Sequence, residues 1–301
     1  MARRNGTTGR SRAGETAEQV LRRRMAEQLA VVVQNEARAR KGSEDGLHDI
    51  RVALRRTRSL AMTFRKLDPD GLDRLDRRIA KLCDRMGAAR DLDVWIELLR
   101  GMIKAGGLAD VTVGQRRAVL ALLRRERTRL AAEALTCRAF RRVKQMIRDC
   151  SRRRLPVRRK TVPPPETFAA RRMLVVRELI AERHRRVGNY SKGPAHDLRR
   201  AGRRLRYLSE FFAPRLGPEC VRAGHWITKA QAALGKVHDC DSALELSRDL
   251  PTGRARSAVR QALKHRRRDQ LIKFKSAWRH YARQQLQKAW QKRLEVAAGQ
   301  A

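Results

Sequence analysis

Two segments of the chain, LHDIRVALRRTRSL and AHDLRRAGRRLRYL, carry the same pattern, in which a His-Asp pair is followed by regularly spaced arginines. A constant offset of 148 residues relates them. Over residues 47–67 and 195–215 the two copies share nine identities in 21 positions without a gap. We interpret the chain as a duplication, which predicts two similar helical bundles related by an internal pseudo-twofold.

Apolar residues recur at helical spacing along most of the chain, and no segment alternates convincingly with period two. We therefore predict an all-α protein. The expected helices cover residues 15–41, 47–67, 71–86, 91–104, 113–150, 168–187, 194–212, 218–234, 239–250 and 254–296.

The domain organisation follows from one break in the pattern. Residues 151–167 read SRRRLPVRRKTVPPPET, and three consecutive prolines cannot continue a helix, so this segment is predicted to be a basic, proline-rich linker. It separates a first helical half, 15–150, from a second, 168–298. Residues 1–14 are expected to form a basic, disordered tail. Residues 15–298 together are expected to make one domain.

The charge of the chain calls for an anionic partner. Lys and Arg number 72 against 31 Asp and Glu, which gives a formal net charge of +41. A surface of this kind repels itself and attracts nucleic acid, inorganic polyphosphate, anionic membrane or acidic protein. No apolar run is long enough to span a membrane. The five scattered cysteines predict reduced thiols in a cytoplasmic protein.

The repeated segment forms an amphipathic helix on which the histidine and three arginines share one sector of about 80°. Almost no acidic residue accompanies the row, so its like charges destabilise the bare helix, and a bound anion relieves that strain. The fork of an arginine side chain suits phosphate oxygens. The rows comprise His48, Arg51, Arg55 and Arg58 in the first copy and His196, Arg199, Arg203 and Arg206 in the second.

The histidines of the two rows admit three interpretations. In the first, each donates a hydrogen bond to phosphate and becomes more positive below its usual pKa of about 6.5. In the second, each is a structural histidine with a satisfied partner. The third is a metal-dependent phosphohydrolase site, because His-Asp dipeptides begin at His48, His196 and His238. Adjacent helical residues point about 100° apart, so one dipeptide alone does not chelate a metal.

Four aspartates also match between the halves. Asp91 and Asp93, with their copies Asp239 and Asp241, precede apolar runs, which predicts helix N-caps and first turns. The matched glycines just before them, Gly87 and Gly235, are expected to end a helix or to allow close helix approach.

These segments together resemble a known family. LHDIRVALRRTRSL and RMGAARDLDV, followed by AHDLRRAGRRLRYLSEFF and AALGKVHDCDSALEL, are similar to the CHAD family, the conserved histidine α-helical domains. The resemblance runs from the first expected helix to the last. It implies two helical bundles and a basic surface between them that binds polyphosphate, in a protein of cytoplasmic polyphosphate granules. Some members are fused to a triphosphate-processing CYTH domain, whose strand-rich pattern is not found here.

The resemblance therefore favours a stand-alone, non-catalytic binding module with no cofactor and no metal ligands. One departure concerns Arg90, whose counterpart in the second half is His238, so this position does not require a permanent charge. The predicted polyphosphate-binding residues are His48, Arg51, Arg55, Arg56, Arg58, Lys81, Arg90, His196, Arg199, Arg203, Arg204, Arg206 and Lys229.

Two competing functions remain. Sequence-independent nucleic-acid binding is compatible with the charge, but aromatic residues make up only 4% of the chain. The four tryptophans, at positions 95, 226, 278 and 290, lie in apolar helical patterns, so they are predicted to be core residues rather than platforms for bases. The metal-dependent phosphohydrolase described above is the second competitor.

Overall fold

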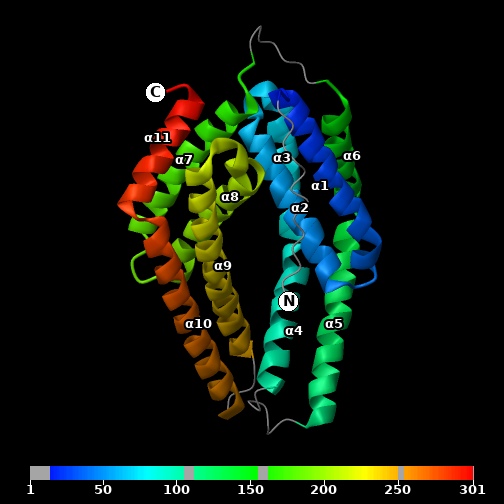
Figure 1. Ribbon diagram of the computed structural model, residues 1–301. Coiled ribbons are helices and arrows are strands. Elements are labelled where there is room, and N and C mark those ends of the chain that lie inside the picture. The colour runs from blue at the N-terminus through cyan, green and yellow to red at the C-terminus, as the bar shows by residue number, and fades with distance from the viewer. Residues whose placement is uncertain (1–13, 105–111, 155–161, 250–253, 301) are drawn as a thin grey trace. The chain divides into compact units, whose positions relative to one another are not determined.

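The structure, a computed structural model, describes residues 14–104, 112–154, 162–249 and 254–300 (Figure 1). These residues form eleven α-helices and two short 3₁₀ segments, with no strand among them, so the predicted all-α fold is confirmed. The helices are α1 (Ala17–Arg40), α2 (Glu44–Thr63), α3 (Pro69–Arg85), α4 (Gly87–Lys104), α5 (Val113–Thr136), α6 (Arg138–Arg152), α7 (Pro165–Arg185), α8 (Lys192–Leu216), α9 (Pro218–Leu246), α10 (Arg254–Tyr281) and α11 (Gln284–Ala298).

The chain divides into two compact units. The first contains Leu21–Val157 and Gly235–Ile272, and we call it the α2 unit. The second contains Met1–Val20, Arg158–Leu234 and Lys273–Ala301, and we call it the α8 unit. The units do not follow the two sequence halves, because the end of α9 and most of α10 group with the first half. The duplication itself stays a prediction.

Two of the expected segments fall largely outside the described residues. These are the basic tail, of which only Gly14 is described, and the central part of the linker, 155–161. The ends of the linker are helical, because α6 continues to Arg152 and α7 begins at Pro165. A proline is tolerated there, since the first turn of a helix has no intrahelical acceptor for its missing N–H.

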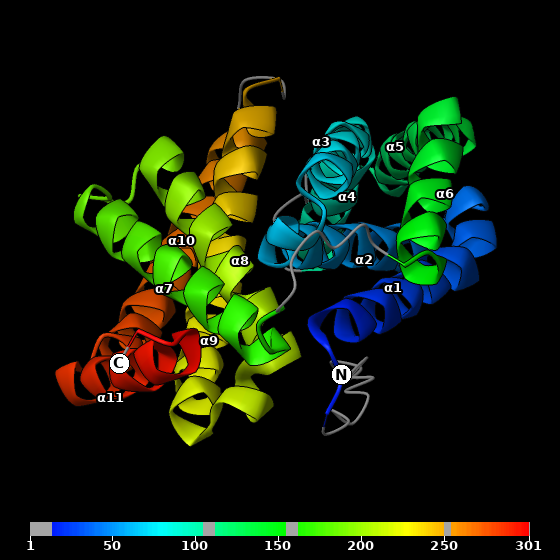
Figure 2. The ribbon, with the colours of Figure 1, turned by 90° about the horizontal axis from the view of Figure 1, so that it is seen from above.

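The α2 unit is organised around α3, which packs against α2, α4 and α6 (Figure 2). A second apolar cluster joins α4 to the two long helices from the other half of the sequence. Trp95 and Leu99 of α4 pack there with Ala243 of α9 and with Val259 and Leu263 of α10. This burial explains why residues 235–272 belong to the α2 unit.

The start of α2 is fixed by a side-chain cap and a close helix contact. The Ser43 hydroxyl accepts a hydrogen bond from the backbone N–H of Gly46 at 3.1 Å. A Cβ on Gly46 would lie 2.9 Å from the backbone nitrogen of Ala39, so only glycine lets α2 begin this close to α1. The cap and this contact set where the first histidine-arginine row begins.

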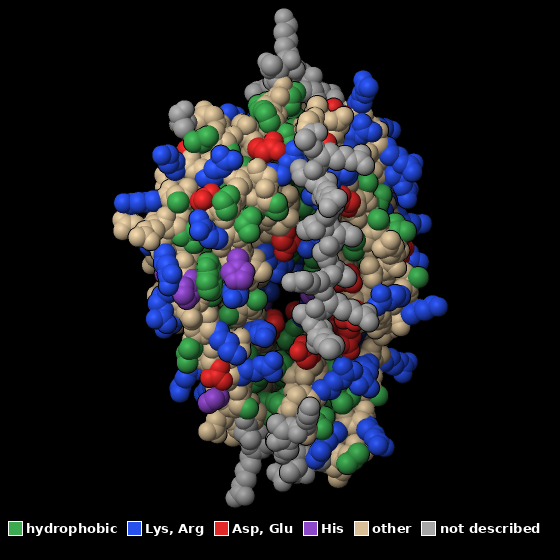
Figure 3. All heavy atoms as spheres, in the orientation of Figure 1, with side chains coloured by type: hydrophobic (Ala, Val, Ile, Leu, Met, Phe, Trp, Pro, Cys, Tyr) green, Lys and Arg blue, Asp and Glu red, His purple; other side chains and the backbone are tan. Residues whose placement is uncertain are grey.

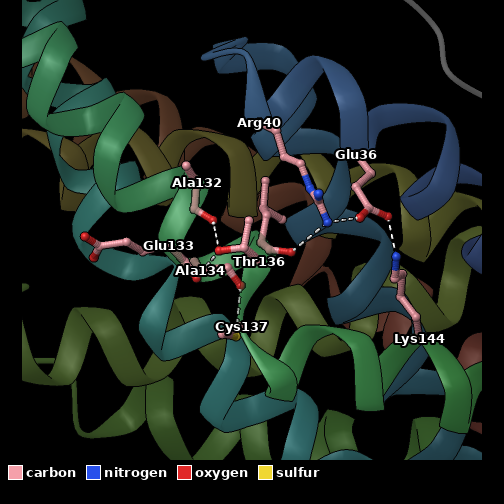
Figure 4. Close-up of polar contacts among 9 residues, drawn as sticks. Glu36, Arg40, Ala132, Glu133, Ala134, Thr136, Cys137 and Lys144 are labelled. Atoms are coloured by element: carbon pink, nitrogen blue, oxygen red, sulfur yellow. Dashed lines mark hydrogen bonds and ion pairs between the residues drawn. The ribbon is translucent and has the colours of Figure 1, made fainter.

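The single helix predicted over 113–150 is wrong, because Cys137 has extended backbone angles and separates α5 from α6. The Thr136 hydroxyl donates back to the carbonyl of Ala132 at 2.9 Å, and Arg40 of α1 donates to the carbonyl of Leu135 at 3.3 Å (Figure 4). Glu36 of α1 accepts from Lys144 of α6 at 2.5 Å. Arg40 of α1 thus satisfies a carbonyl at the end of α5, and Glu36 of α1 holds the following helix, α6. No glycine or proline marks this break in the sequence.

Two other helix boundaries differ from the prediction. The helices predicted over 218–234 and 239–250 are one continuous helix, α9, which runs through Gly235 and ends at Leu246, whereas α3 ends at Arg85 and α4 begins at Gly87. The long helix predicted over 254–296 is interrupted just before Gln284, where Arg283 takes non-helical angles as the N-cap of α11. Both predictions are wrong at these points.

The matched aspartates do not cap helices, so that prediction is also wrong. Asp93 lies inside α4 and accepts a hydrogen bond from Nε of Arg127 in α5 at 2.6 Å, with both side chains almost fully buried. Asp241 lies inside α9 and accepts from Nε of Arg267 in α10 at 2.6 Å. Asp93 and Asp241 thus each tie their helix to the one that follows.

In the α8 unit, α7 packs against α8 and α11 (Figure 2). Trp290 of α11 is buried, as is Trp95 in the α2 unit, so these two tryptophans are core residues as predicted. Trp226 and Trp278 are half-buried. Their rings stack on His280 and His184, with ring centroids 4.2 and 4.0 Å apart.

All five cysteines are free thiols. Within the described ranges, every helix is either too short or too polar to cross a membrane.

Candidate functional site

The first histidine-arginine row lies on α2. His48 is exposed at the start of the helix, Arg55 and Arg58 are half-buried, and Arg51 is buried. Predicted as one row of phosphate ligands, these side chains in fact have different surroundings. Arg51 and Arg58 are hydrogen-bonded to α3, and Arg55 is not.

Arg51 is a helix-packing residue in this structure. The residue is 7% exposed, and its guanidinium donates to the main-chain carbonyl of Cys83 near the end of α3, at 2.8 Å. Burial, and then the charge of Arg55, lower the pKa of Arg51 to about 10, so it stays charged at neutral pH. The side chain satisfies a carbonyl close to the negative end of the α3 dipole.

Arg58 is also engaged with α3. Its Nε donates to Oδ1 of Asp76 at 2.7 Å and its Nη2 to Oδ2 at 3.3 Å. Partial burial of the guanidinium opposes the effect, but the hydrogen bond with Asp76 raises the pKa of Arg58. Within α2 itself the arginine row has almost no acidic partner, but α3 supplies Asp76 as a partner for Arg58.

The cations that remain gather around His48. Its pKa is lowered by partial desolvation and then by the charge of Arg90, with Arg55 and Arg51 adding to the effect and Asp49 opposing it. Arg90 comes from α4, so the fold brings together two predicted residues that are 42 positions apart. Arg55 makes no hydrogen bond or ion pair with any described residue. We call His48, Arg55 and Arg90 the α2 cluster.

The second row lies on α8. The pKa of His196 is lowered by desolvation, and then by the positive charges of Arg199, Arg200 and Arg203, with Asp197 opposing. We call His196 and these three arginines the α8 cluster. Arg200 was missed from the sequence because its counterpart in the first copy is a valine. The signal that could have identified Arg200 is its spacing of four residues from His196, which places both residues on one face of the helix.

Arg206, like its counterpart Arg58, is held by its neighbours. It donates to Oε1 of Gln231 in α9 at 2.9 Å and lies 3.4 Å from Glu210. The position that matches Asp76 is Gly224, where a Cβ would lie 2.7 Å from that of Ser209 in α8. In the second copy, α8 and α9 therefore approach closely at the position where the first copy has the carboxylate of Asp76.

The other predicted residues lie at the surface or beside the rows. Lys81 of α3, Arg204 of α8 and Lys229 of α9 are exposed, and Arg56 is half-buried. The Lys229 ammonium lies 4.7 Å from the centre of the Trp226 ring. Lys and Arg side chains are spread over the face drawn in Figure 3, including over α5 and α10. Basic charge alone therefore does not define the site.

The α2 cluster and the α8 cluster belong to different units. The expectation that both rows face one shared surface stays a prediction. In the part of the chain that the structure describes, no three His, Cys, Asp or Glu side chains are grouped so as to hold a metal ion.

The lowered pKa values of His48 and His196 predict how stability depends on pH. The unfolded histidines bind protons near their ordinary pKa of about 6.5, before the folded ones do, so stability falls as the pH drops below this value. Thermal unfolding at pH 8 and at about pH 5.5 measures this loss. The double variant His48→Gln, His196→Gln is expected to lose less stability on acidification than the wild type. An equal loss in both proteins contradicts this assignment.

Comparison with known families agrees with this geometry. The model of the CHAD domain family matches residues 23–248, which is more than half of the chain. The chain belongs to the CHAD family. No curated protein matches it.

Two solved structures resemble this CHAD protein over most of its length. The crystal structure of the CHAD domain from the plant Ricinus communis is 21% identical, with a TM-score of 0.62, over 93% of this chain and 92% of that one. PptA from Streptomyces chartreusis is 17% identical, with a TM-score of 0.60, over 88% of this chain and 99% of that one. At these identities the likeness establishes the fold alone.

Proposed function

We propose that this CHAD protein binds inorganic polyphosphate without catalysing a reaction, and does so at cytoplasmic polyphosphate granules. The observation that carries the proposal is the environment of the two matched histidines. Burial, and then the charges of neighbouring arginines, lower the pKa of each histidine, and these arginine charges place each histidine in a region of positive potential. A polyanion entering such a region relieves the repulsion among the cations and favours protonation of the imidazole.

The chemistry of the clusters suits a phosphate chain. Guanidinium groups offer paired, charge-assisted hydrogen bonds to phosphoryl oxygens, and a histidine N–H adds a second kind of donor. Polyphosphate carries about one charge per phosphate and has no bases to stack, so cations without an aromatic platform are sufficient. The half-buried Trp226 and Trp278 already stack on His280 and His184, which argues against nucleic-acid binding through these rings.

Binding is expected to depend steeply on salt. If the five arginines of the two clusters and Lys81 each neutralise one phosphate, a slope of about −0.7 per contact predicts a loss of roughly 300-fold between about 50 and 200 mM salt. Titration of end-labelled long-chain polyphosphate, followed by fluorescence anisotropy, measures this slope. A salt-independent affinity contradicts the proposal.

Two further readouts distinguish the proposed function from its competitors. Affinity for long-chain polyphosphate should rise as the pH falls from about 7.5 to 5.5, because binding favours protonation of both histidines. Phosphate release in the presence of Mg²⁺ or Mn²⁺ favours the metal-dependent phosphohydrolase, and its absence under all metal conditions favours a binding protein.

A further inference from the structure

A cavity of about 470 Å³ lies between α3 and α6, within the α2 unit. It is built by helical spacing, since Gly71, Arg74 and Arg78 share one face of α3, and Arg142 and Met146 share one face of α6. Its volume is within the range of small-molecule sites. Five guanidinium groups line it, from Arg74, Arg78, Arg142, Arg153 and Arg154.

The two carboxylates in the cavity wall do not pair with these arginines. Asp68 is the N-cap of α3, and its Oδ1 accepts from the backbone N–H of Gly71 at 3.0 Å. A Cβ on Gly71 would overlap sterically with Oδ2 of Asp68, so the glycine makes room for the cap. Asp149 of α6 accepts from the side-chain amide of Gln145 at 2.9 Å.

The five arginines have no anionic partner within the described ranges. None of their side chains forms an ion pair or hydrogen bond with another described residue. Arg78 is the deepest of them, and its Nε is buried without an acceptor. A buried donor that lacks an acceptor is unfavourable, and five like charges around one cavity repel each other. Both features are relieved by an anion in the cavity.

We infer that the α3–α6 cavity is a second anion site, which binds two or three linked phosphoryl groups of a short oligophosphate, free or as the phosphate tail of a nucleotide. Five guanidiniums against two carboxylates leave three positive charges, which suits a short multivalent anion. Met146 and Cys150 give part of the wall an apolar character. The site is separate from the α2 cluster, because none of its lining residues belongs to α2 or α4.

Cys150 supplies a local readout. Its half-buried thiol lines the cavity, whereas Cys137, also half-buried, does not. Burial, and then the charges of Asp68 and Asp149, raise the pKa of Cys150 to about 11, so it is modified slowly by an uncharged reagent such as N-ethylmaleimide. A ligand in the cavity shields this thiol further.

The experiment follows alkylation of each cysteine by mass spectrometry with sodium tripolyphosphate or ATP present. At ten times the dissociation constant, the empty fraction is about one-eleventh, so alkylation of Cys150 should slow roughly tenfold while that of Cys137 is unchanged. Protection at lower concentrations of ATP than of tripolyphosphate identifies a nucleotide, and equal protection identifies the phosphoryl groups alone. No protection of Cys150 by either ligand overturns the inference.

Matched variants locate the effect. Arg78→Gln with Arg142→Gln removes two cavity charges, whereas Arg77→Gln with Arg141→Gln removes two exposed neighbours on the same helices. Protection should disappear in the first pair and persist in the second. Arg153→Gln with Arg154→Gln gives the same test at exposed positions, should the first pair fail to fold. Equal protection in the cavity and neighbour pairs overturns the inference.

The test is independent of the proposed function. Arg55→Glu in the α2 cluster should weaken long-chain polyphosphate binding and leave protection of Cys150 by tripolyphosphate intact. Failure of the cavity site is therefore distinguishable from failure of the clusters.

Discussion

Replacing Arg55, Arg90, Arg200 and Arg203 with glutamate is expected to lower the affinity for long-chain polyphosphate by at least about a thousandfold, or ~4 kcal/mol. Each substitution removes hydrogen bonds from a charged donor, worth about 1.5–3 kcal/mol apiece, and adds a charge that repels phosphate. Fluorescence anisotropy at constant salt measures the loss. Arg51 is kept, because it is buried and a carboxylate there would face the carbonyl of Cys83.

The matched control makes the same change in net charge at four positions outside the two clusters. Arg124 and Arg125 of α5, Arg279 of α10 and Arg283 before α11 are exposed, and all four become glutamate. The affinity of this control for long-chain polyphosphate should fall by less than about tenfold, because distant exposed charges act only through a field that salt screens. Circular dichroism should find both variants as helical as the wild type. Equal losses would mean that net charge, and not the two clusters, determines binding.

Asp93→Ala is expected to cost about 3–5 kcal/mol of the free energy of unfolding, because it leaves Arg127 buried without its carboxylate. Arg127 also donates to the carbonyl of Ser43, the N-cap of α2, at 3.2 Å. Loss of the pair therefore loosens the start of the helix that carries His48. Urea unfolding followed by circular dichroism measures the cost.

Two comparisons test this explanation. Asp241→Ala should cost less, since the side chain of Arg267 is 21% exposed, against 2% for Arg127. Glu126→Ala removes a largely solvent-accessible partner of Arg129 in α5, whose side chain is 44% exposed, and should leave stability unchanged within error. If Asp93→Ala is no more destabilising than Glu126→Ala, the buried pair does not stabilise the α2 unit.

Much of the architecture was predictable from the sequence because it is encoded locally. Helical spacing of apolar residues predicted the all-α fold, and the repeated His-Arg pattern predicted that α2 and α8 carry matched rows. Breaks without a local signal were missed, as at Cys137, where partners from α1 satisfy the helix end. Gly235 was expected to end a helix or to allow close helix approach, but α9 continues through it.

The candidate site was predictable only in part, because an arginine's role depends on what a distant segment places beside it. Arg51 and Arg58 share a helix face with Arg55, yet the carbonyl of Cys83 and the carboxylate of Asp76 hold the first two. Likewise, Asp93 resembled a helix cap until Arg127, 34 residues away, was seen to pair with it. Such partners come from tertiary packing, which residue spacing alone does not specify.

Competition between polyphosphate and DNA tests the central claim most directly. Labelled long-chain polyphosphate is bound to the wild-type protein at fixed salt, and duplex DNA or unlabelled polyphosphate is added at equal phosphate concentration. The two clusters predict that unlabelled polyphosphate displaces the label and that DNA requires at least about tenfold more phosphate to do so. Displacement by DNA at the same phosphate concentration would contradict the account.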